Sequence, residues 1–158
     1  MAKQEKTNVM RLLEQKKIPF EMHDYTESGA IAGEDVARVL GENPNEVFKT
    51  LVTVGKSKQN YVFLVPVNKE LNLKKAASAV GEKSIEMIKS KDLLGLTGYI
   101  HGGCSPIGMK KQFPIVVHNT AEAMENILFS GGKIGVQVEL KTEDFKKIIK
   151  IKFADVTN

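Results

Sequence analysis

Hydrophobic and polar residues recur along the chain with two periods, and each period predicts one kind of element. Apolar residues at helical spacing, bounded by capping and breaking residues, predict helices, whereas apolar runs and strict alternation predict strands. The expected helices cover residues 7–17, 33–40, 73–80, 120–125 and 142–149, with a further helical turn from residue 90. The expected strands cover residues 20–25, 48–54, 61–67, 85–88, 115–118, 127–130, 134–140 and 151–156.

Many of these strands are neighbours joined by hairpin-like loops, with helices scattered between them. Strict strand–helix–strand alternation is absent, and no segment has the composition of a linker, a repeat or a low-complexity tract. The pattern predicts a single α+β domain over residues 1–158 with a mixed, largely antiparallel sheet.

Local signals refine two of the helices and one strand. Thr7 should cap the first helix and Pro19 should end it. The second helix should turn Val36, Val39 and Leu40 inward and stop at the next glycine. Residues 134–140 alternate apolar and other side chains, which predicts a half-buried strand.

Composition then excludes several classes of protein. The chain has 158 residues, of which 42% are hydrophobic and 27% are charged, the balance of an ordinary globular domain. The longest apolar run spans residues 61–67, too short for a membrane-crossing helix, which needs about 20 residues. Cys104 is the single cysteine, so no internal disulfide can form, and the N-terminus lacks the apolar core of a secretory signal. We expect a cytoplasmic protein without membrane contact.

Charge is distributed unevenly along the chain. Residues 1–48 carry a net charge of −3, residues 49–118 carry +7, and residues 119–158 are neutral. The basic middle segment fits a polyanion partner, and it equally fits a lysine-rich solvated surface. Arg11 and Arg38 are the only arginines, so base readout on duplex DNA is disfavoured.

The usual catalytic arrangements are missing from the sequence. His23, His101 and His118 lack metal-ligand spacing, so we expect no metal and no cofactor. Ser130 follows a phenylalanine rather than standing in a GxSxG elbow. Cys104 has lysines six and seven residues downstream that could lower its pKa, but a buried, inert cysteine is the commoner case.

Two glycine-rich segments and one lysine are the remaining candidates. The segment 98–108 holds Gly102-Gly103, whose backbone N–H groups could face an anion or a carbonyl oxygen. Ser130-Gly131-Gly132 is a second such place. Both could equally be tight turns, and neither has the spacing of a nucleotide-binding loop. Lys49 opens an apolar strand and points either outward or into a pocket.

A series of these motifs, in order from residue 9 to residue 156, resembles one family. The residues that carry the resemblance are Tyr25, Lys49-Thr50-Leu51, Gly98-Tyr99, Gly102-Gly103, Ser105-Pro106, Gly108, Ser130-Gly131-Gly132 and Lys152-Phe153-Ala154-Asp155. The chain is similar to the YbaK/EbsC family, relatives of the editing domain inserted in bacterial prolyl-tRNA synthetases, and most similar to the branch that deacylates Cys-tRNA(Pro). The resemblance implies a barrel-like or largely antiparallel sheet with surrounding helices.

The resemblance also implies a function and a site. Members clear cysteinyl-tRNA(Pro), which arises because a proline pocket rejects residues of similar size weakly. Lys49, Gly102 and Gly103 would act on the ester, and Tyr25, Thr50, Ser130 and Gly131 would bind the substrate. The substrate's own thiol is expected to attack the ester. The acceptor end of aminoacyl-tRNA and prolyl-tRNA synthetase would be partners.

The chain departs from the family pattern at two places. Ile134 stands where members often carry an arginine, and residues 26–32 lack a large aromatic residue found in some relatives. Two alternatives therefore stay open: a deacylase for another small aminoacyl-tRNA such as Ala-tRNA(Pro), and a non-catalytic module that binds tRNA or a nucleotide.

Overall fold

Eight strands and five α-helices make up the part of the chain that the computed structural model describes, residues 6–158. The helices are α1 (Asn8–Gln15), α2 (Gly33–Leu40), α3 (Leu73–Val80), α4 (Leu93–Thr97) and α5 (Thr142–Ile148), with 3-10 turns η1 (Thr26–Ser28), η2 (Ser90–Asp92) and η3 (Asn119–Ala123). The strands are β1 (Glu21–Asp24), β2 (Phe48–Gly55), β3 (Asn60–Pro66), β4 (Ile85–Met87), β5 (Ile115–His118), β6 (Asn126–Lys133), β7 (Val136–Lys141) and β8 (Ile151–Ala154).

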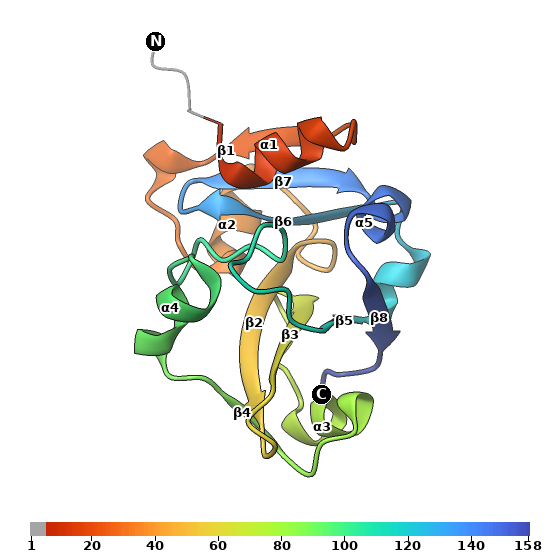
Figure 1. Cartoon of the computed structure of the whole chain (residues 1–158). Coiled ribbons are helices and arrows are strands. Elements are labelled where there is room, and N and C mark those ends of the chain that lie inside the picture. The colour runs from red at the N-terminus through yellow and green to blue at the C-terminus, as the bar shows by residue number, and fades with distance from the viewer. Residues whose placement is uncertain (1–5) are drawn as a thin grey trace.

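The strands divide between two sheets. β1, β7 and β6 form an antiparallel sheet in the order β1-β7-β6. The other sheet has the order β4-β2-β3-β5-β8 and is mixed, because β5 pairs parallel to both β3 and β8. β2 passes beside β6, and a parallel bridge joins Val47 to Leu128 (Figure 1). This bridge and the contacts between β2 and β6 bring the two sheets together.

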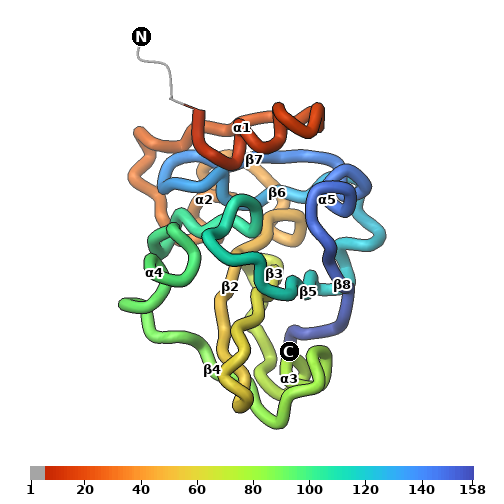
Figure 2. The backbone as a smooth tube through the Cα atoms, viewed as in Figure 1, coloured from red at the N-terminus to blue at the C-terminus, as the bar shows by residue number. Residues whose placement is uncertain are grey.

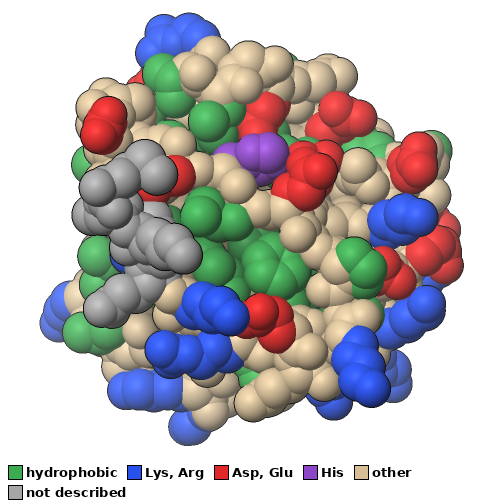
Figure 3. Space-filling model, turned by 90° about the horizontal axis from the view of Figure 1, so that it is seen from above, with side chains coloured by type: hydrophobic (Ala, Val, Ile, Leu, Met, Phe, Trp, Pro, Cys, Tyr) green, Lys and Arg blue, Asp and Glu red, His purple; other side chains and the backbone are tan. Residues whose placement is uncertain are grey.

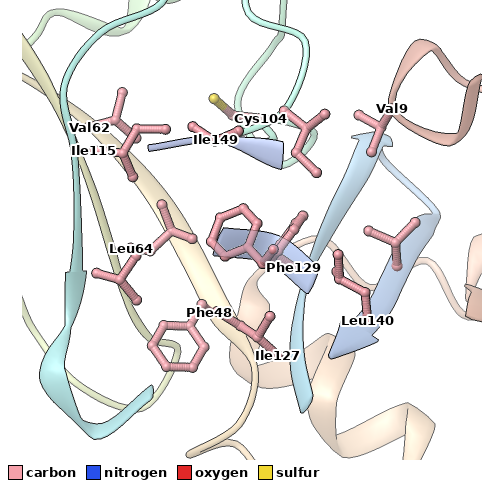
Figure 4. Packing of buried hydrophobic residues seen from close by; sticks show 14 of the residues in the cluster. Val9, Phe48, Val62, Leu64, Cys104, Ile115, Ile127, Phe129, Leu140 and Ile149 are labelled. Atoms are coloured by element: carbon pink, nitrogen blue, oxygen red, sulfur yellow. The ribbon is translucent and has the colours of Figure 1, made fainter. Parts of the chain in front are cut away.

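The main core lies between the two sheets. Figure 4 shows Phe48 and Leu64 of the mixed sheet facing Ile127, Phe129 and Leu140 of the antiparallel sheet. All five side chains are buried, and the ring of Phe129 packs on that of Phe145 in α5 with 5.0 Å between centroids. Burial of these large apolar side chains supplies the main driving force for closing one sheet over the other.

A smaller apolar cluster lies on the other face of the mixed sheet, beneath α3. Phe63, Val65 and Val116 point to this face and pack with Ala76 and Ala77 of the helix. The tube view shows the C-terminus running beside α3 (Figure 2), where the Asn72 N–H donates to the carbonyl of Val156. Both faces of the mixed sheet are therefore covered at this end.

Capping residues set the helix boundaries where the sequence predicts them. The Thr7 hydroxyl accepts a hydrogen bond from the Met10 N–H at 3.2 Å, and Asn72 caps α3 in the same way at Lys75. Gly41 and Gly81 end α2 and α3 in the left-handed conformation. The α+β class is confirmed, and no helix among residues 6–158 is long and apolar enough to cross a membrane.

Several local predictions are wrong. The first helix ends at Gln15, before Pro19, because Lys17 adopts a left-handed conformation with φ of 58°. Val39 is 47% exposed, and Ala37 is buried in its place. The helix expected at 120–125 is the 3-10 turn η3, and α4 had no predicted counterpart beyond the helical turn from residue 90.

Candidate functional site

A cavity of about 490 Å³ opens between the two sheets. Its wall comes from segments far apart in the sequence: Tyr25, the start of α2, the first half of β2, the turn at residues 101–104, and the facing ends of β6 and β7. Among these segments is the run Phe48–Leu51, the first four positions of β2, which the antiparallel pairing with β3 holds in register. A pocket of this size suits a small-molecule group or the end of a larger ligand.

Lys49 lines this cavity from β2. Its side chain is 28% exposed, and Nζ lies 3.8 Å from Oε1 of Glu70, a residue whose own side chain is 80% exposed. Such a long, solvated ion pair is weak. The Lys49 ammonium group is therefore available to a negatively charged or carbonyl group of a ligand.

Thr50 and Tyr25 also reach the cavity wall. The Thr50 hydroxyl is buried and has no hydrogen-bond partner among the described residues. Tyr25 is buried, its N–H donates to the carbonyl of Gly135 at 2.8 Å, and desolvation raises the pKa of its phenol. Both residues carry a neutral O–H and belong to the buried part of the cavity wall.

The turn at residues 101–104 contains two glycines, of which one belongs to the cavity wall. Gly102 has φ of 87°, and a Cβ at this position would lie 2.8 Å from Cγ2 of Ile31, so only glycine fits without strain. The Gly102 N–H has no partner among residues 6–158, whereas the Gly103 N–H donates to the carbonyl of Ile100 at 3.0 Å. Gly102 lines the cavity and Gly103 does not.

The second glycine-rich segment lies within β6 rather than after it. The register of β6 and β7 shifts between Ser130 and Lys133, and the Ser130 hydroxyl accepts a hydrogen bond from the Gly132 N–H inside this bulge. Ser130 lines the cavity. Gly131 is buried outside the cavity lining, where a Cβ would lie 2.7 Å from Cγ1 of Val136.

Cys104 lies in the cavity wall but is chemically unreactive there. It is 8% exposed, and burial raises the pKa of its thiol to about 12. A thiol with this pKa stays protonated near neutral pH, and the thiolate is the nucleophilic form. The structure thus favours the buried, inert cysteine over a nucleophile.

Gln137 is a cavity residue that the sequence pattern hides. It occupies an alternating position on β7, yet it is 2% exposed and lines the cavity. Its Nε2 donates to Oε1 of Glu42 at 2.9 Å, and its Oε1 is buried without a partner among the described residues. Glu42 is 95 positions away in sequence, so only the folded chain reveals this contact.

Acidic side chains and a histidine lie together on the antiparallel sheet, on β1 and β7. Figure 3 shows a histidine bordered by acidic side chains, with lysine and arginine side chains along the lower edge of that face. His23 Nε2 bonds to Oε1 of Glu139 at 2.8 Å and lies 4.0 Å from Glu42. Glu21, His23 and Glu139 each place one ligand atom within 4.8 Å of the others, which is close enough for the three to hold a cation. The sequence does not show this group because β1 and β7 are distant in the chain.

The fold and cavity define an α+β domain with a ligand-sized pocket between two sheets. Residues 27–148 match the sequence model of the aminoacyl-tRNA editing domain. The chain is 46% identical to a candidate Cys-tRNA(Pro)/Cys-tRNA(Cys) deacylase, EbsC, of Enterococcus faecalis over 98% of this chain and 94% of that protein. The chain therefore belongs to the aminoacyl-tRNA editing domain family, within its YbaK/EbsC group.

Two further likenesses agree with this assignment. The proline–tRNA ligase of Thermosipho melanesiensis is 32% identical over 63% of this chain and 17% of the ligase. A solved structure described as a candidate trans-editing enzyme for prolyl-tRNA synthetase superposes with a TM-score of 0.83 at 21% identity, over 96% of this chain and 98% of the other. The first likeness covers a small part of a large enzyme, and the second shows the fold.

Proposed function

We propose that this chain is a trans-editing deacylase that releases cysteine from mischarged Cys-tRNA(Pro). The observation that carries the proposal is the convergence of Tyr25, Lys49, Thr50, Gly102 and Ser130 on one cavity. The E. faecalis relative, whose name states this activity, supports the choice of substrate. The whole chain would then act as one editing domain.

The reaction begins at the substrate's own thiol. The sulfur attacks the ester carbonyl, the ester C–O bond breaks, and the ribose hydroxyl leaves with a proton. Cysteine departs as a four-membered cyclic thioester. This step needs no nucleophile from the protein, which agrees with the protonated, buried state of Cys104.

The protein's task is to stabilise charge that develops on the carbonyl oxygen. Gly102 lines the cavity and its N–H has no partner among residues 6–158, so this N–H is the backbone donor that we assign to this oxygen. The Gly103 N–H, which the sequence also nominates, is engaged with Ile100. Lys49 supplies a positive charge beside the ester or the terminal phosphate.

The substrate would enter as the acceptor end of aminoacyl-tRNA. Lysines give residues 49–118 their net charge of +7, and such a surface binds phosphates without reading bases. We further propose that the protein works in the cytoplasm beside prolyl-tRNA synthetase, which produces the mischarged tRNA. The similarity to a segment of a proline–tRNA ligase supports this pairing.

A panel of esters on one tRNA tests the proposal. Purified protein is incubated with Cys-tRNA(Pro), Ala-tRNA(Pro) and Pro-tRNA(Pro), and the remaining aminoacyl-tRNA is measured over time. We expect rapid loss of the cysteinyl ester alone. Preferential loss of the alanyl ester would overturn the choice of substrate and keep the class, whereas salt-sensitive tRNA binding without turnover would favour a binding module.

A further inference from the structure

The start of α2 brings two acidic residues to the wall of the cavity. Glu34 and Asp35 belong to the first turn of this helix, and both line the cavity. Both residues are exposed, so a ligand that enters the cavity can reach them. Side chains of a helix lean toward its N-terminus, which is the end of α2 that borders the cavity. The wall therefore carries negative charge on α2 as well as the positive charge of Lys49 on β2.

Of these two carboxylates, that of Glu34 is the one without a partner. Asp35 accepts a hydrogen bond from Nη2 of Arg38 at 2.8 Å, within the same helix. Glu34 has no hydrogen-bond or ion-pair partner in the described part of the chain, residues 6–158. Its carboxylate can therefore exchange water for a cationic group of a ligand without giving up a contact within the protein.

The opposite charges of Glu34 and Lys49 are also not paired with each other. Among the described residues, the partner of the Lys49 ammonium group is the exposed Glu70, at 3.8 Å. Charges of both signs thus stay available on different elements of one cavity wall. Such a wall is complementary to a ligand that carries a positive and a negative group at some distance from each other, and this complementarity fixes the orientation of the ligand.

An aminoacyl ester at the acceptor end of a tRNA is a ligand of this kind. Its α-ammonium group is positive, the phosphate groups of the acceptor end are negative, and the ester and the ribose lie between them. When the phosphate lies on the side of Lys49, the ammonium group lies on the side of α2. The reverse orientation would bring like charges together, which is unfavourable.

We infer that Glu34 binds the α-ammonium group of the aminoacyl ester and so sets the direction in which the ester lies in the cavity. This inference rests on the proposed deacylase function. The ammonium N–H groups donate to the carboxylate, and such charge-assisted hydrogen bonds are stronger than neutral ones. Because the α-ammonium group is attached to the carbon next to the reacting carbonyl, the contact also holds that carbonyl in place. Glu34 thereby becomes a substrate-binding residue.

An ester in which a hydroxyl group replaces the ammonium group tests the contact. Deacylation of Cys-tRNA(Pro) is compared with that of β-mercaptolactyl-tRNA(Pro), which keeps the thiol and nearly the same size. Each rate is divided by the uncatalysed rate of the same ester, because the ammonium group itself activates the carbonyl. Glu34→Gln should lower kcat/KM for the cysteinyl ester by about fivefold, the upper range for an exposed ion pair, and leave the hydroxy ester unchanged.

A glutamate outside the cavity provides the matched control. Glu122 is exposed in η3 and does not line the cavity, so Glu122→Gln removes the same charge and should change neither rate. An acidic side chain in the first turn also stabilises a helix. Urea titration of Glu34→Gln measures that contribution separately. Equal loss on both esters would show a role confined to the helix or to the ribose and would overturn the inference.

Two outcomes separate this inference from the proposed function. A wild type that cleaves neither ester contradicts the deacylase itself and the inference with it. A wild type that cleaves the cysteinyl ester, together with a Glu34→Gln enzyme that keeps the wild-type ratio of the two rates, contradicts the ammonium contact alone.

Discussion

At the scale of single residues, the account depends most on Lys49. Its ammonium group lies in the cavity wall with only a distant, solvated partner in Glu70. Replacing Lys49 by Met keeps the stem and removes the charge. We expect deacylation to fall by about 100-fold or more, as when one charge-stabilising group is removed from an active site. Single-turnover assays on Cys-tRNA(Pro) measure this loss.

The control for Lys49 is an exposed lysine outside both the cavity and the basic segment 49–118. Lys150 is exposed between α5 and β8, so Lys150→Met should leave the rate unchanged. Wild-type activity in Lys49→Met would remove this residue from the site.

Cys104 gives the opposite prediction. Because burial holds its thiol protonated, Cys104→Ala should leave kcat for Cys-tRNA(Pro) nearly unchanged. The buried side chain should still contribute to stability, so a decrease in the free energy of unfolding of about 1 kcal/mol is expected from urea titration. Complete loss of activity in a folded variant would restore the protein-nucleophile mechanism.

Residue types alone left Lys49, Gly102 and Ser130 open between a site and ordinary structure, and the resemblance to the family nominated these residues together with Thr50 and Tyr25. Neither was enough for Gln137, whose alternating position suggests a solvent-facing side chain. The structure buries it and pairs its amide with Glu42, a contact across 95 positions. Gly103 is the opposite case, a residue that the sequence nominated and the structure leaves out of the cavity wall. Its N–H is not free, because it donates to the carbonyl of Ile100 within the turn.

At the scale of elements, the turn at residues 101–104 is the most constrained part of the site. Gly102→Ala places a methyl group 2.8 Å from Ile31 in a left-handed conformation. We expect a loss of stability of about 1–3 kcal/mol and a marked loss of deacylation, because the donor N–H moves. Chemical denaturation and the deacylation assay measure the two effects.

Gly81 offers a control for backbone strain alone. It has φ of +74°, and a Cβ there would meet nothing within 4 Å. Gly81→Ala should therefore lower stability by about 1 kcal/mol while keeping full activity. If Gly102→Ala kept full activity as well, the turn would have no part in the reaction.

The bounds of α2 and α3 could be predicted to the residue, because each helix stops at a glycine and Asn72 also caps α3 at its start. The division of the strands into two sheets could not be predicted. It depends on the bridge between Val47 and Leu128 and on the parallel neighbours of β5, which join segments distant in the chain.

At the scale of the whole molecule, the C-terminal segment is tied to the mixed sheet through His118. This side chain is 6% exposed, its Nδ1 accepts from the Val156 N–H at 3.3 Å, and its Nε2 lies 3.3 Å from the Thr157 hydroxyl. Desolvation lowers the pKa of His118; Lys75 and Lys69 add to this effect, and Asp155 opposes it. The folded chain therefore holds the imidazole neutral.

This arrangement predicts a pH-dependent stability. Above about pH 6.5, the usual pKa of a histidine, both folded and unfolded chains hold His118 neutral and its contribution is complete. As the pH falls toward the lower pKa of the folded state, the unfolded chain binds the proton first, and stability decreases. Urea titrations of the wild type and His118→Gln between pH 5 and about 8 should show a steeper decrease in the wild type. Parallel curves would contradict the assignment.

The most direct test of the central claim compares two esters that differ only at sulfur. Deacylation rates are measured for Cys-tRNA(Pro) and S-methyl-Cys-tRNA(Pro) with the wild-type protein. The account predicts rapid cleavage of the free-thiol ester and no cleavage above background of the methylated one. Equal rates would show that water or a protein group attacks the ester. They would contradict the proposal that the substrate's thiol is the nucleophile and that the cavity binds and positions the substrate.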